Sequence, residues 1–238
     1  MWDNPRLLNY VAGILTGIAL LIFVLAAAQL ALRSTAFPLR QITVRGTLAH
    51  TAAAQIERAT RGRIAGNFFS VDLAAVRAGL EQLPWVRRVN VRRLWPDGLE
   101  IEIEERVALA RWGDDALVDS QGERFVAHTD AAMPTFFGPA GTEAEVTRRY
   151  RRFSALLAPL GDPLVRLTLT PRYAWQLKLR SGLSVVLGRD TNELPVEARL
   201  ARFVAVYPQT LGKIPQRHEY VDLRYPNGFA LRVQDMKG

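Results

Sequence analysis

The residues that could carry out acid–base or metal chemistry are few and scattered in this sequence. The three histidines, His50, His128 and His218, lie far apart, with no HExxH motif and no carboxylate beside them at metal-ligand spacing. The chain has no cysteine, which excludes disulfides and thiolate metal sites. It also has no GxSxG elbow and no glycine-rich phosphate loop. We therefore expect no enzymatic activity, no metal, no cofactor and no small-molecule substrate.

One cluster of carboxylates resembles paired catalytic acids, but the pattern around it favours a different role. The cluster consists of Glu100, Glu102, Glu104 and Glu105. Leu99, Ile101 and Ile103 alternate with these acids, which is the period of a half-buried strand. Three of the acids are therefore expected on the solvent face of that strand. A membrane-anchored cell-wall hydrolase, the best enzymatic alternative, needs paired carboxylates in a cleft, which the sequence does not show.

The strand with these acids forms the second half of a predicted hairpin over residues 83–106. Valines alternate with polar residues in its first half, and a Trp-Pro-Asp-Gly turn joins the two halves. A register that pairs Val91 with Ile101 places the apolar side chains on one face, and it sets Arg92 against Glu100 on the other. A slip of one residue would destroy both patterns, so the register is well specified.

The composition limits the remaining function classes. The length of 238 residues fits one to two domains beside a membrane segment. The net charge of +8 comes almost entirely from arginine, which could attract nucleic acid, anionic lipid or an acidic polymer. The arginines are spread over predicted strands and helix faces without an aromatic platform, so we expect a solvated surface and no nucleic-acid partner.

Residues 11–32 form an uncharged and predominantly apolar run near the start of the chain. As a helix the run is roughly 33 Å long, enough to cross a hydrocarbon core of about 30 Å. The run is longer than the core of a typical signal peptide, although Ala26-Ala27-Ala28 offers a cleavage site, so an uncleaved anchor is the favoured interpretation. Arginines on both sides leave the orientation open.

The segment after the anchor predicts a small domain of strand, helix, helix, strand and strand. A first strand over residues 39–45 ends at Gly46, helices follow over 51–60 and 72–82 with Ser70 or Asp72 as a cap, and the hairpin closes the domain. This order, with the motifs FPLRQITVRG, GNFFSVDL and LPWVRRVNVRRLWPDGLEIEIEER, resembles a POTRA domain. A generic small α+β domain is the alternative interpretation.

The second half of the chain predicts another α+β domain after Gly113. Short strands are expected over 117–125, a loop over 133–141, and a helix from a Thr142 and Glu145 capping box to Gly161. Strands over 164–170, 174–180 and 183–187 precede a helix that starts at Pro195, with Ala198, Ala201, Phe203 and Val206 toward a core. A hairpin with a Pro-Asn-Gly turn closes the chain over 220–233. We expect a mostly antiparallel sheet that ends in this hairpin.

Taken together, the anchor, the POTRA module and the motifs LVDSQGERF, AWQLKLRSGLSVVLGR, ARLARFVAVYP and YVDLRYPNGFALRV resemble the FtsQ/DivIB family of cell division proteins over essentially the whole chain. The resemblance implies a short cytoplasmic tail (1–10), a single-pass helix (11–32), and periplasmic POTRA (38–107) and C-terminal (112–234) domains. It also implies a non-enzymatic inner-membrane scaffold at the division septum. Its implied partners are the FtsB and FtsL complex, with other division proteins at the POTRA domain and the membrane helix.

The resemblance also implies a partner-binding site near the end of the chain. It places FtsB on the residues Arg189, Arg224, Tyr225, Pro226, Asn227, Gly228, Phe229, Ala230 and Leu231. Tyr225 would be an aromatic anchor, Arg224 a cationic partner, and Arg189 would meet a carboxylate of the partner. The alternative is that Tyr225 and Phe229 fill the domain core and that Arg189 is solvated. An alternative function is a POTRA-bearing export or assembly factor, which would continue into a β-barrel.

Overall fold

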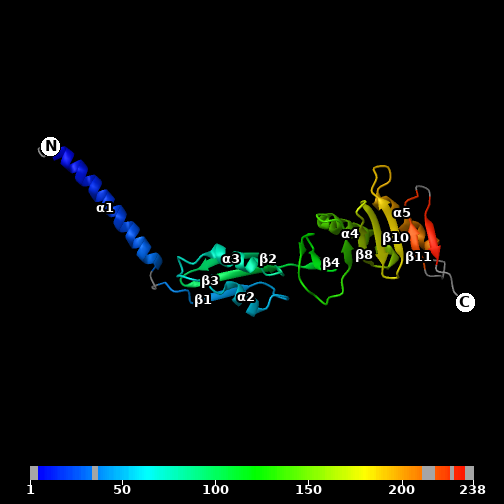
Figure 1. Ribbon diagram of the computed structural model, residues 1–238, viewed down its shortest axis with the longest axis horizontal. Coiled ribbons are helices and arrows are strands. Elements are labelled where there is room, and N and C mark those ends of the chain that lie inside the picture. Colours follow the sequence, from blue (N-terminus) through cyan, green and yellow to red (C-terminus); the bar gives the residue numbers. More distant parts are fainter. Residues whose placement is uncertain (1–4, 34–36, 211–217, 226–227, 234–238) are drawn as a thin grey trace. The chain divides into compact units, whose positions relative to one another are not determined.

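The computed structural model describes residues 5–33, 37–210, 218–225 and 228–233 (Figure 1). The chain divides into two compact units between Glu105 and Arg106. The first unit contains α1 (Pro5–Arg33), β1 (Gln41–Arg45), α2 (Ala53–Thr60), α3 (Leu73–Glu81), β2 (Val86–Leu94) and β3 (Gly98–Glu105). The second contains β4 (Ala108–Trp112), β5 (Ala116–Asp119), β6 (Arg124–Phe125), β7 (Thr135–Phe137), α4 (Glu143–Leu157), β8 (Leu164–Leu169), β9 (Ala174–Leu179), β10 (Ser184–Arg189), α5 (Val196–Val206), β11 (His218–Asp222) and β12 (Ala230–Val233).

Helix α1 is long and apolar enough to cross a membrane. Its segment from Leu8 to Leu30 has a mean hydropathy of 2.6, and none of it is buried against the rest of the chain. An exposed apolar surface of this length requires an apolar environment. The predicted anchor over residues 11–32 lies within α1.

The three strands of the first unit form one sheet in the order β1, β3, β2. Strand β2 is antiparallel to β3 with the predicted register, Val91 opposite Ile101 and Arg92 opposite Glu100, and β1 is parallel to β3. Helices α2 and α3 contribute Ile56, Val76 and Leu80 to the buried core against the apolar face of the hairpin. Asp72 caps α3 by accepting a hydrogen bond from the Ala75 N–H at 3.0 Å. The predicted POTRA order of elements is confirmed.

The face of β3 that carries the acids differs from the prediction at one residue. Glu100 is buried, although Glu102 and Glu104 are exposed. Its carboxylate contacts Arg92 at 2.6 Å and Arg45 of β1 at 3.4 Å. The parallel strand β1 covers this position, and the two arginines neutralise the buried charge. The hairpin alone places Glu100 in solvent, and the pairing of β1 with β3 buries it.

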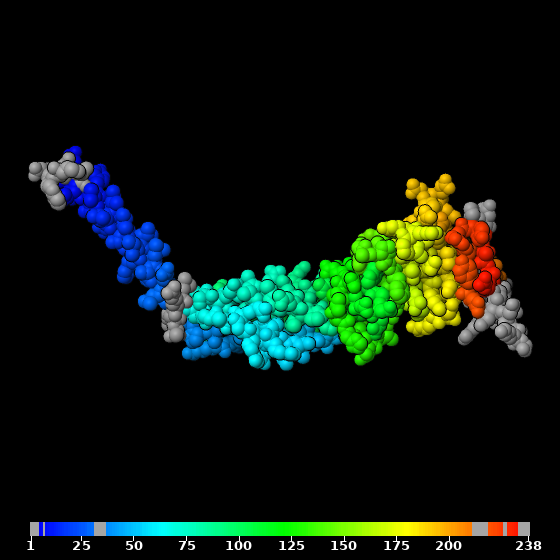
Figure 2. Space-filling view, viewed as in Figure 1, coloured from blue at the N-terminus to red at the C-terminus, as the bar shows by residue number. Residues whose placement is uncertain are grey.

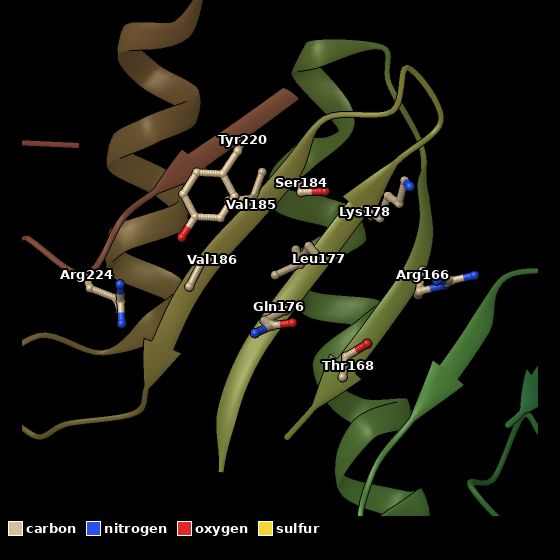
Figure 3. A pocket seen from close by; sticks show the side chains of 10 residues that line it. All are labelled: Arg166, Thr168, Gln176, Leu177, Lys178, Ser184, Val185, Val186, Tyr220 and Arg224. Carbon is tan, nitrogen blue, oxygen red and sulfur yellow. The ribbon is translucent and has the colours of Figure 1, made fainter. Parts of the chain in front are cut away.

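The second unit is built on one nine-stranded sheet in the order β12, β11, β10, β9, β8, β7, β4, β5, β6. Five of its pairings among the described residues are antiparallel, whereas β4 with β7, β7 with β8 and β10 with β11 are parallel. Helices α4 and α5 contact β8 and β10 and lie together behind the sheet in Figure 3. The buried side chains of the helices and of that sheet face form one hydrophobic core. The predicted α+β class is confirmed.

Some local predictions in the second unit are wrong. The expected loop over 133–141 contains β7, a three-residue strand between β4 and β8 with Phe136 fully buried. Thr142 is the N-cap residue of α4, but its side chain makes no capping hydrogen bond; its hydroxyl donates to the Pro139 carbonyl at 2.6 Å. In α5, Ala198 and Ala201 are exposed. The buried residues of α5 are Val196, Arg199, Leu200, Phe203 and Val204.

The first strand of the second unit starts before the boundary expected from the sequence. Strand β4 pairs with β5 and β7 and therefore belongs to the nine-stranded sheet. The sequence interpretation placed the start of the second domain at residue 112, whereas the division between the units falls at residues 105 and 106.

Candidate partner-binding edge

Strand β12 lies at one end of the nine-stranded sheet and pairs only with β11 among the described residues. Figure 2 shows these last strands, coloured red, at the surface beside the yellow strands of the same unit. The backbone of an edge strand can accept a further strand from another chain. The position of the predicted terminal hairpin at the end of the sheet therefore meets the first requirement of a strand-addition site.

The pairing on the inner side of β12 identifies which backbone groups point outward. The Leu223 N–H donates to the Val186 carbonyl at 2.9 Å, so Leu223 and Val221 direct their backbone groups toward β10. The alternate residues of β11 then direct theirs toward β12, where they lie opposite Ala230 and Arg232. Leu231 lies opposite Val221, so its N–H and C=O point to the open side.

The side chains of the predicted pairing strand divide between core and solvent. Phe229 packs on the hydrophobic core, with its ring perpendicular to that of Phe203 at a centroid distance of 6.0 Å. Leu231 also packs on the core, whereas Ala230 is exposed. The alternative interpretation of Phe229 as a core residue agrees with this packing. Contact of Phe229 and Leu231 with a partner stays a prediction, and their side chains hold β12 on the sheet.

Arg224 is held by an ion pair within its own hairpin. Its Nε and Nη2 donate to the buried Asp222 carboxylate at 2.9 Å and 2.6 Å, and its backbone N–H donates to Asp222 Oδ1 at 3.0 Å. The hydrogen bonds from the Arg224 side chain lower the pKa of Asp222 despite its burial. The same pair raises the pKa of Arg224. The Arg224 guanidinium would therefore contact a partner while it is held in place by its ion pair with Asp222.

Tyr225 is exposed three residues after the end of β11, so it does not fill the core. Its exposed fraction is 54%, and its backbone carbonyl accepts a hydrogen bond from Arg202 Nη2 at 3.1 Å. A large aromatic ring on a fixed backbone is typical of an interface anchor. Gly228 follows as an exposed residue. The predicted site residues Pro226 and Asn227 lie outside the described residues.

Arg189 ends β10 beyond a bulge. The ladder with β9 shifts register between Val186 and Gly188, and Gly188 has a φ of +79°, which favours glycine. A Cβ at Gly188 would meet Arg224 Cγ at 2.8 Å, so the Arg224 side chain packs directly over this glycine. The bulge thus brings Arg224 next to the segment that presents Arg189, and the Arg189 side chain is exposed.

A hollow of about 340 Å³ lies beside Arg189 on the same unit. Tyr173 and Trp175 line it together with Arg189 and Arg149. Arg149 contacts Glu145 at 3.0 Å and also pairs with Asp190 and Glu197. The arginines were expected at a solvated surface. Among those of α4, Arg149 is the exception because the loop after β10 and α5 supply carboxylates. Glu145 and Asp190 also line the hollow, so carboxylates of the same unit already neutralise the charge of Arg149 there.

Two buried polar residues that support this edge were missed from the sequence. Arg199 is buried, and its Nη1 donates to the carbonyls of Leu187 and Arg189, the latter at 2.9 Å. Asp222 holds Arg224 as described above. Arg199 follows the apolar stripe of α5 at helical spacing, so its periodicity could have identified it as inward-facing. The sequence pattern does not indicate that Asp222 is buried, because the alternation of side chains in β11 places it on the face of the sheet opposite the core.

The open face of the sheet carries polar side chains over strands β8 to β11. A shallow depression of about 490 Å³ lies there, lined among others by Arg166, Gln176, Lys178, Tyr220 and Arg224 (Figure 3). The Tyr220 hydroxyl donates to Asp222 Oδ2 at 3.4 Å, and burial together with the charge of Asp222 raises the pKa of Tyr220. This polar face is continuous with the Asp222 and Arg224 pair at the hairpin.

These features define a class of protein. A membrane-spanning helix, a POTRA-like domain and a second α+β domain with an open sheet edge are typical of an envelope protein that acts by binding other proteins. Residues 37–106 match the family described as POTRA domain, FtsQ-type. Residues 110–224 match the family described as Cell division protein FtsQ/DivIB, C-terminal.

Named relatives support the same family over the full length. The chain is 42% identical over 240 residues to Cell division protein FtsQ of Burkholderia pseudomallei, covering 100% of this chain and 96% of the relative. It is 39% identical over 237 residues to the Nitrosospira multiformis protein of the same name, covering 98% and 99%. The Neisseria gonorrhoeae protein is 36% identical over 235 residues, covering 98% and 95%. The chain belongs to the FtsQ/DivIB family and is a membrane-anchored cell division protein.

Proposed function

We propose that this protein is a non-enzymatic scaffold of the divisome with one membrane span. Its amino terminus would lie in the cytoplasm and both domains in the periplasm, at the septum of the inner membrane. The C-terminal edge would bind the FtsB subunit of the FtsB and FtsL complex by strand addition. The observation that carries this proposal is that β12 is an edge strand in the described part of the chain and that its Leu231 directs its backbone groups outward.

In this proposal, backbone and side chains have separate tasks. Outward N–H and C=O groups of β12 would pair with any extended segment, so they supply affinity with little sequence preference. Selection of FtsB would come from the exposed ring of Tyr225 and from Arg189, whose charge suits a carboxylate of the partner. Phe229 would contribute indirectly, because its contact with Phe203 holds the strand in place.

A pair of substitutions at Leu231 separates the backbone from the side chain. Leu231→Ala removes the side chain and keeps the outward N–H, whereas Leu231→Pro also removes the N–H and adds ring bulk at the pairing edge. We expect Leu231→Pro to weaken binding of the periplasmic FtsB segment to the full-length protein at least tenfold more than Leu231→Ala. Calorimetry measures both affinities.

A matched position controls for damage to the hairpin itself. Arg232→Pro removes an N–H that faces β11, so it should disturb β12 in the absence of any partner, as judged by amide hydrogen exchange. Leu231→Pro should leave the exchange of β11 close to that of Leu231→Ala. Equal affinity of the Pro and Ala variants for the FtsB segment would contradict strand addition at β12.

The edge of the first unit favours a second role for the POTRA domain, recruitment by earlier-arriving division proteins. Strand β1 pairs only with β3 among the described residues, and its Ile42 and Val44 side chains are exposed. An exposed apolar edge strand is suited to binding an extended segment. Exchange of residues 39–106 for an unrelated domain should abolish septal localisation. Normal localisation of that chimaera would contradict this role.

A further inference from the structure

Three aromatic side chains are exposed together at one end of the POTRA domain. We call Phe37, Phe69 and Trp95 the aromatic cluster; their exposed fractions are 37%, 42% and 69%. Phe37 meets Phe69 edge to face at a centroid distance of 5.1 Å. The buried ring of Phe68 meets Phe69 at 5.2 Å and Trp95 at 5.7 Å, so it joins the three exposed rings into one patch.

The backbone under the aromatic cluster is fixed by hydrogen bonds. The Phe68 N–H donates to the Phe37 carbonyl at 2.9 Å, which ties the start of the domain to the loop before α3. Arg93 donates from its guanidinium to the carbonyls of Phe68 at 2.6 Å, Phe69 at 3.1 Å and Val71 at 3.0 Å. The backbone at Phe37 and Phe69 is therefore constrained, so the exposure of these two rings is a built feature of the domain.

The covalent chain keeps this patch close to the bilayer. Phe37 is four residues after Arg33, the last residue of α1, so their Cα atoms are at most about 15 Å apart. The apolar span ends at Leu30, which adds about 5 Å of helix. Phe37 therefore lies within about 20 Å of the hydrocarbon boundary, and the headgroup layer itself occupies roughly 5–8 Å of that distance.

We propose that the aromatic cluster inserts into the interfacial layer of the membrane and docks the POTRA domain on the lipid surface. Tryptophan and other aromatic rings are enriched at this layer, where a ring can bury its apolar body and keep a polar group hydrated. A protein partner would have to be recruited from solution, whereas the tether holds the bilayer permanently at a high effective concentration. The exposed Arg40 suits anionic headgroups, and its backbone N–H donates at 2.9 Å to the carbonyl of Asp97, in the turn that contains Trp95. This docking would limit the motion of the POTRA domain relative to the membrane anchor, whichever side of the membrane the domain lies on.

The absence of cysteine allows a direct measurement of immersion in the full-length protein. Leu94 is exposed beside Trp95, and Leu94→Cys places a nitroxide label next to the patch. Asp130→Cys, at a fully exposed side chain of the second unit, gives a control label. Both proteins are reconstituted in vesicles of phosphatidylethanolamine and phosphatidylglycerol without any other protein. Collisions of the label with oxygen, which concentrates in lipid, and with a water-soluble nickel chelate are compared by power saturation.

We expect the label at position 94 to collide more with oxygen and several-fold less with the nickel chelate than the label at position 130. The triple substitution Phe37→Ser, Phe69→Ser and Trp95→Ser should remove this difference. A matched set, Val107→Ser, Val126→Ser and Tyr173→Ser, removes three exposed apolar side chains elsewhere and should retain it. Circular dichroism melting of both sets verifies folding.

Two results would overturn the proposal. One is equal access of the nickel chelate to positions 94 and 130 in these vesicles, which would show that the patch stays in water beside a bare bilayer. The other is a lipid signal at position 94 that survives the triple substitution in a folded protein. Neither result depends on FtsB, so the docking proposal and the scaffold proposal are tested separately.

Discussion

The ion pair beneath the hairpin offers a quantitative test of how the binding edge is held. Asp222→Asn keeps the shape of the side chain but replaces one carboxylate oxygen by an NH₂ group that faces the Arg224 guanidinium. The substitution removes the two-point contact at 2.9 Å and 2.6 Å, while the backbone hydrogen bond from Arg224 can persist. Hydrogen bonds to charged groups contribute about 1.5–3 kcal/mol, but the Arg224 side chain is more than half exposed and solvent screens the pair. We expect a loss of about 1–2 kcal/mol in local stability.

Amide hydrogen exchange of the full-length protein measures this loss where it occurs. A change of 1–2 kcal/mol corresponds to about 5- to 30-fold faster exchange in β11 and β12, with the POTRA domain unchanged. Binding of the FtsB segment should weaken by up to the same factor. Asp162→Asn is the control, because Asp162 lies just before β8 and its Oδ1 accepts a hydrogen bond from the Ser181 N–H at 3.0 Å, not from the terminal hairpin. That variant should exchange like the parent protein in β11 and β12.

The pH dependence of Asp222→Asn tests whether the charge of Asp222 stabilises the hairpin. Hydrogen bonds from Arg224 lower the pKa of Asp222 in the folded protein. Its stabilising contribution is therefore complete above the unfolded value of about 3.9 and is lost as the pH falls through the lower folded pKa. The difference between parent and Asp222→Asn should stay constant from neutral pH to about pH 5 and shrink below about pH 4. Equal exchange of the two proteins at neutral pH would refute this account of the hairpin.

Three further predictions follow from single contacts. Glu105 accepts hydrogen bonds from the backbone N–H groups of Ala49, His50 and Thr51, which lie just before α2. Burial raises the pKa of Glu105, but these bonds lower it by more. Glu105→Gln should therefore lower the unfolding free energy of the POTRA domain by about 1.5–3 kcal/mol at pH 7, with the difference fading below about pH 4 in chemical denaturation. Gly188→Ala adds a Cβ at positive φ against Arg224, so β10 and β11 should exchange faster; unchanged exchange would contradict the bulge geometry. Tyr225→Ala should lower the affinity for FtsB and leave the melting temperature unchanged. Phe229→Lys should lower the affinity and the melting temperature, because its ring packs on Phe203. Calorimetry measures the affinity of each variant, and thermal melts measure its stability.

The elements that the sequence predicted well have local and redundant signals. The POTRA hairpin combines strict alternation, a turn with Pro and Gly, and charge pairs that agree with one register, and the structure has that register. Helix α3 has a capping aspartate and an apolar stripe at helical spacing. In each of these cases a single residue pattern excluded the competing structures without information from distant parts of the chain.

The features that the sequence missed depend on neighbours far away in the chain. Strand β7 has three residues, too few to show alternation, and it exists because β4 and β8 pair with it on both sides. Glu100 is buried because β1 pairs with β3 from an earlier segment. Arg199 bonds to carbonyls at the end of β10, so its burial depends on a bulge in another element. The terminal hairpin was predictable, but its position at the sheet edge required the strand order.

An open edge strand is a liability unless something restricts what pairs with it, and β12 has two such restrictions. The part of it that the structure describes, Ala230–Val233, is four residues long, and the exposed Arg232 places a charge on it. The contacts of Phe229 and Leu231 with the core fix the strand before any partner arrives, so little ordering entropy opposes binding. The backbone groups of a preformed edge would pair with any extended segment, so the choice of partner depends on residues outside the strand. For that reason the exposed Tyr225 and Arg189, rather than the residues of β12, should decide which division protein pairs there.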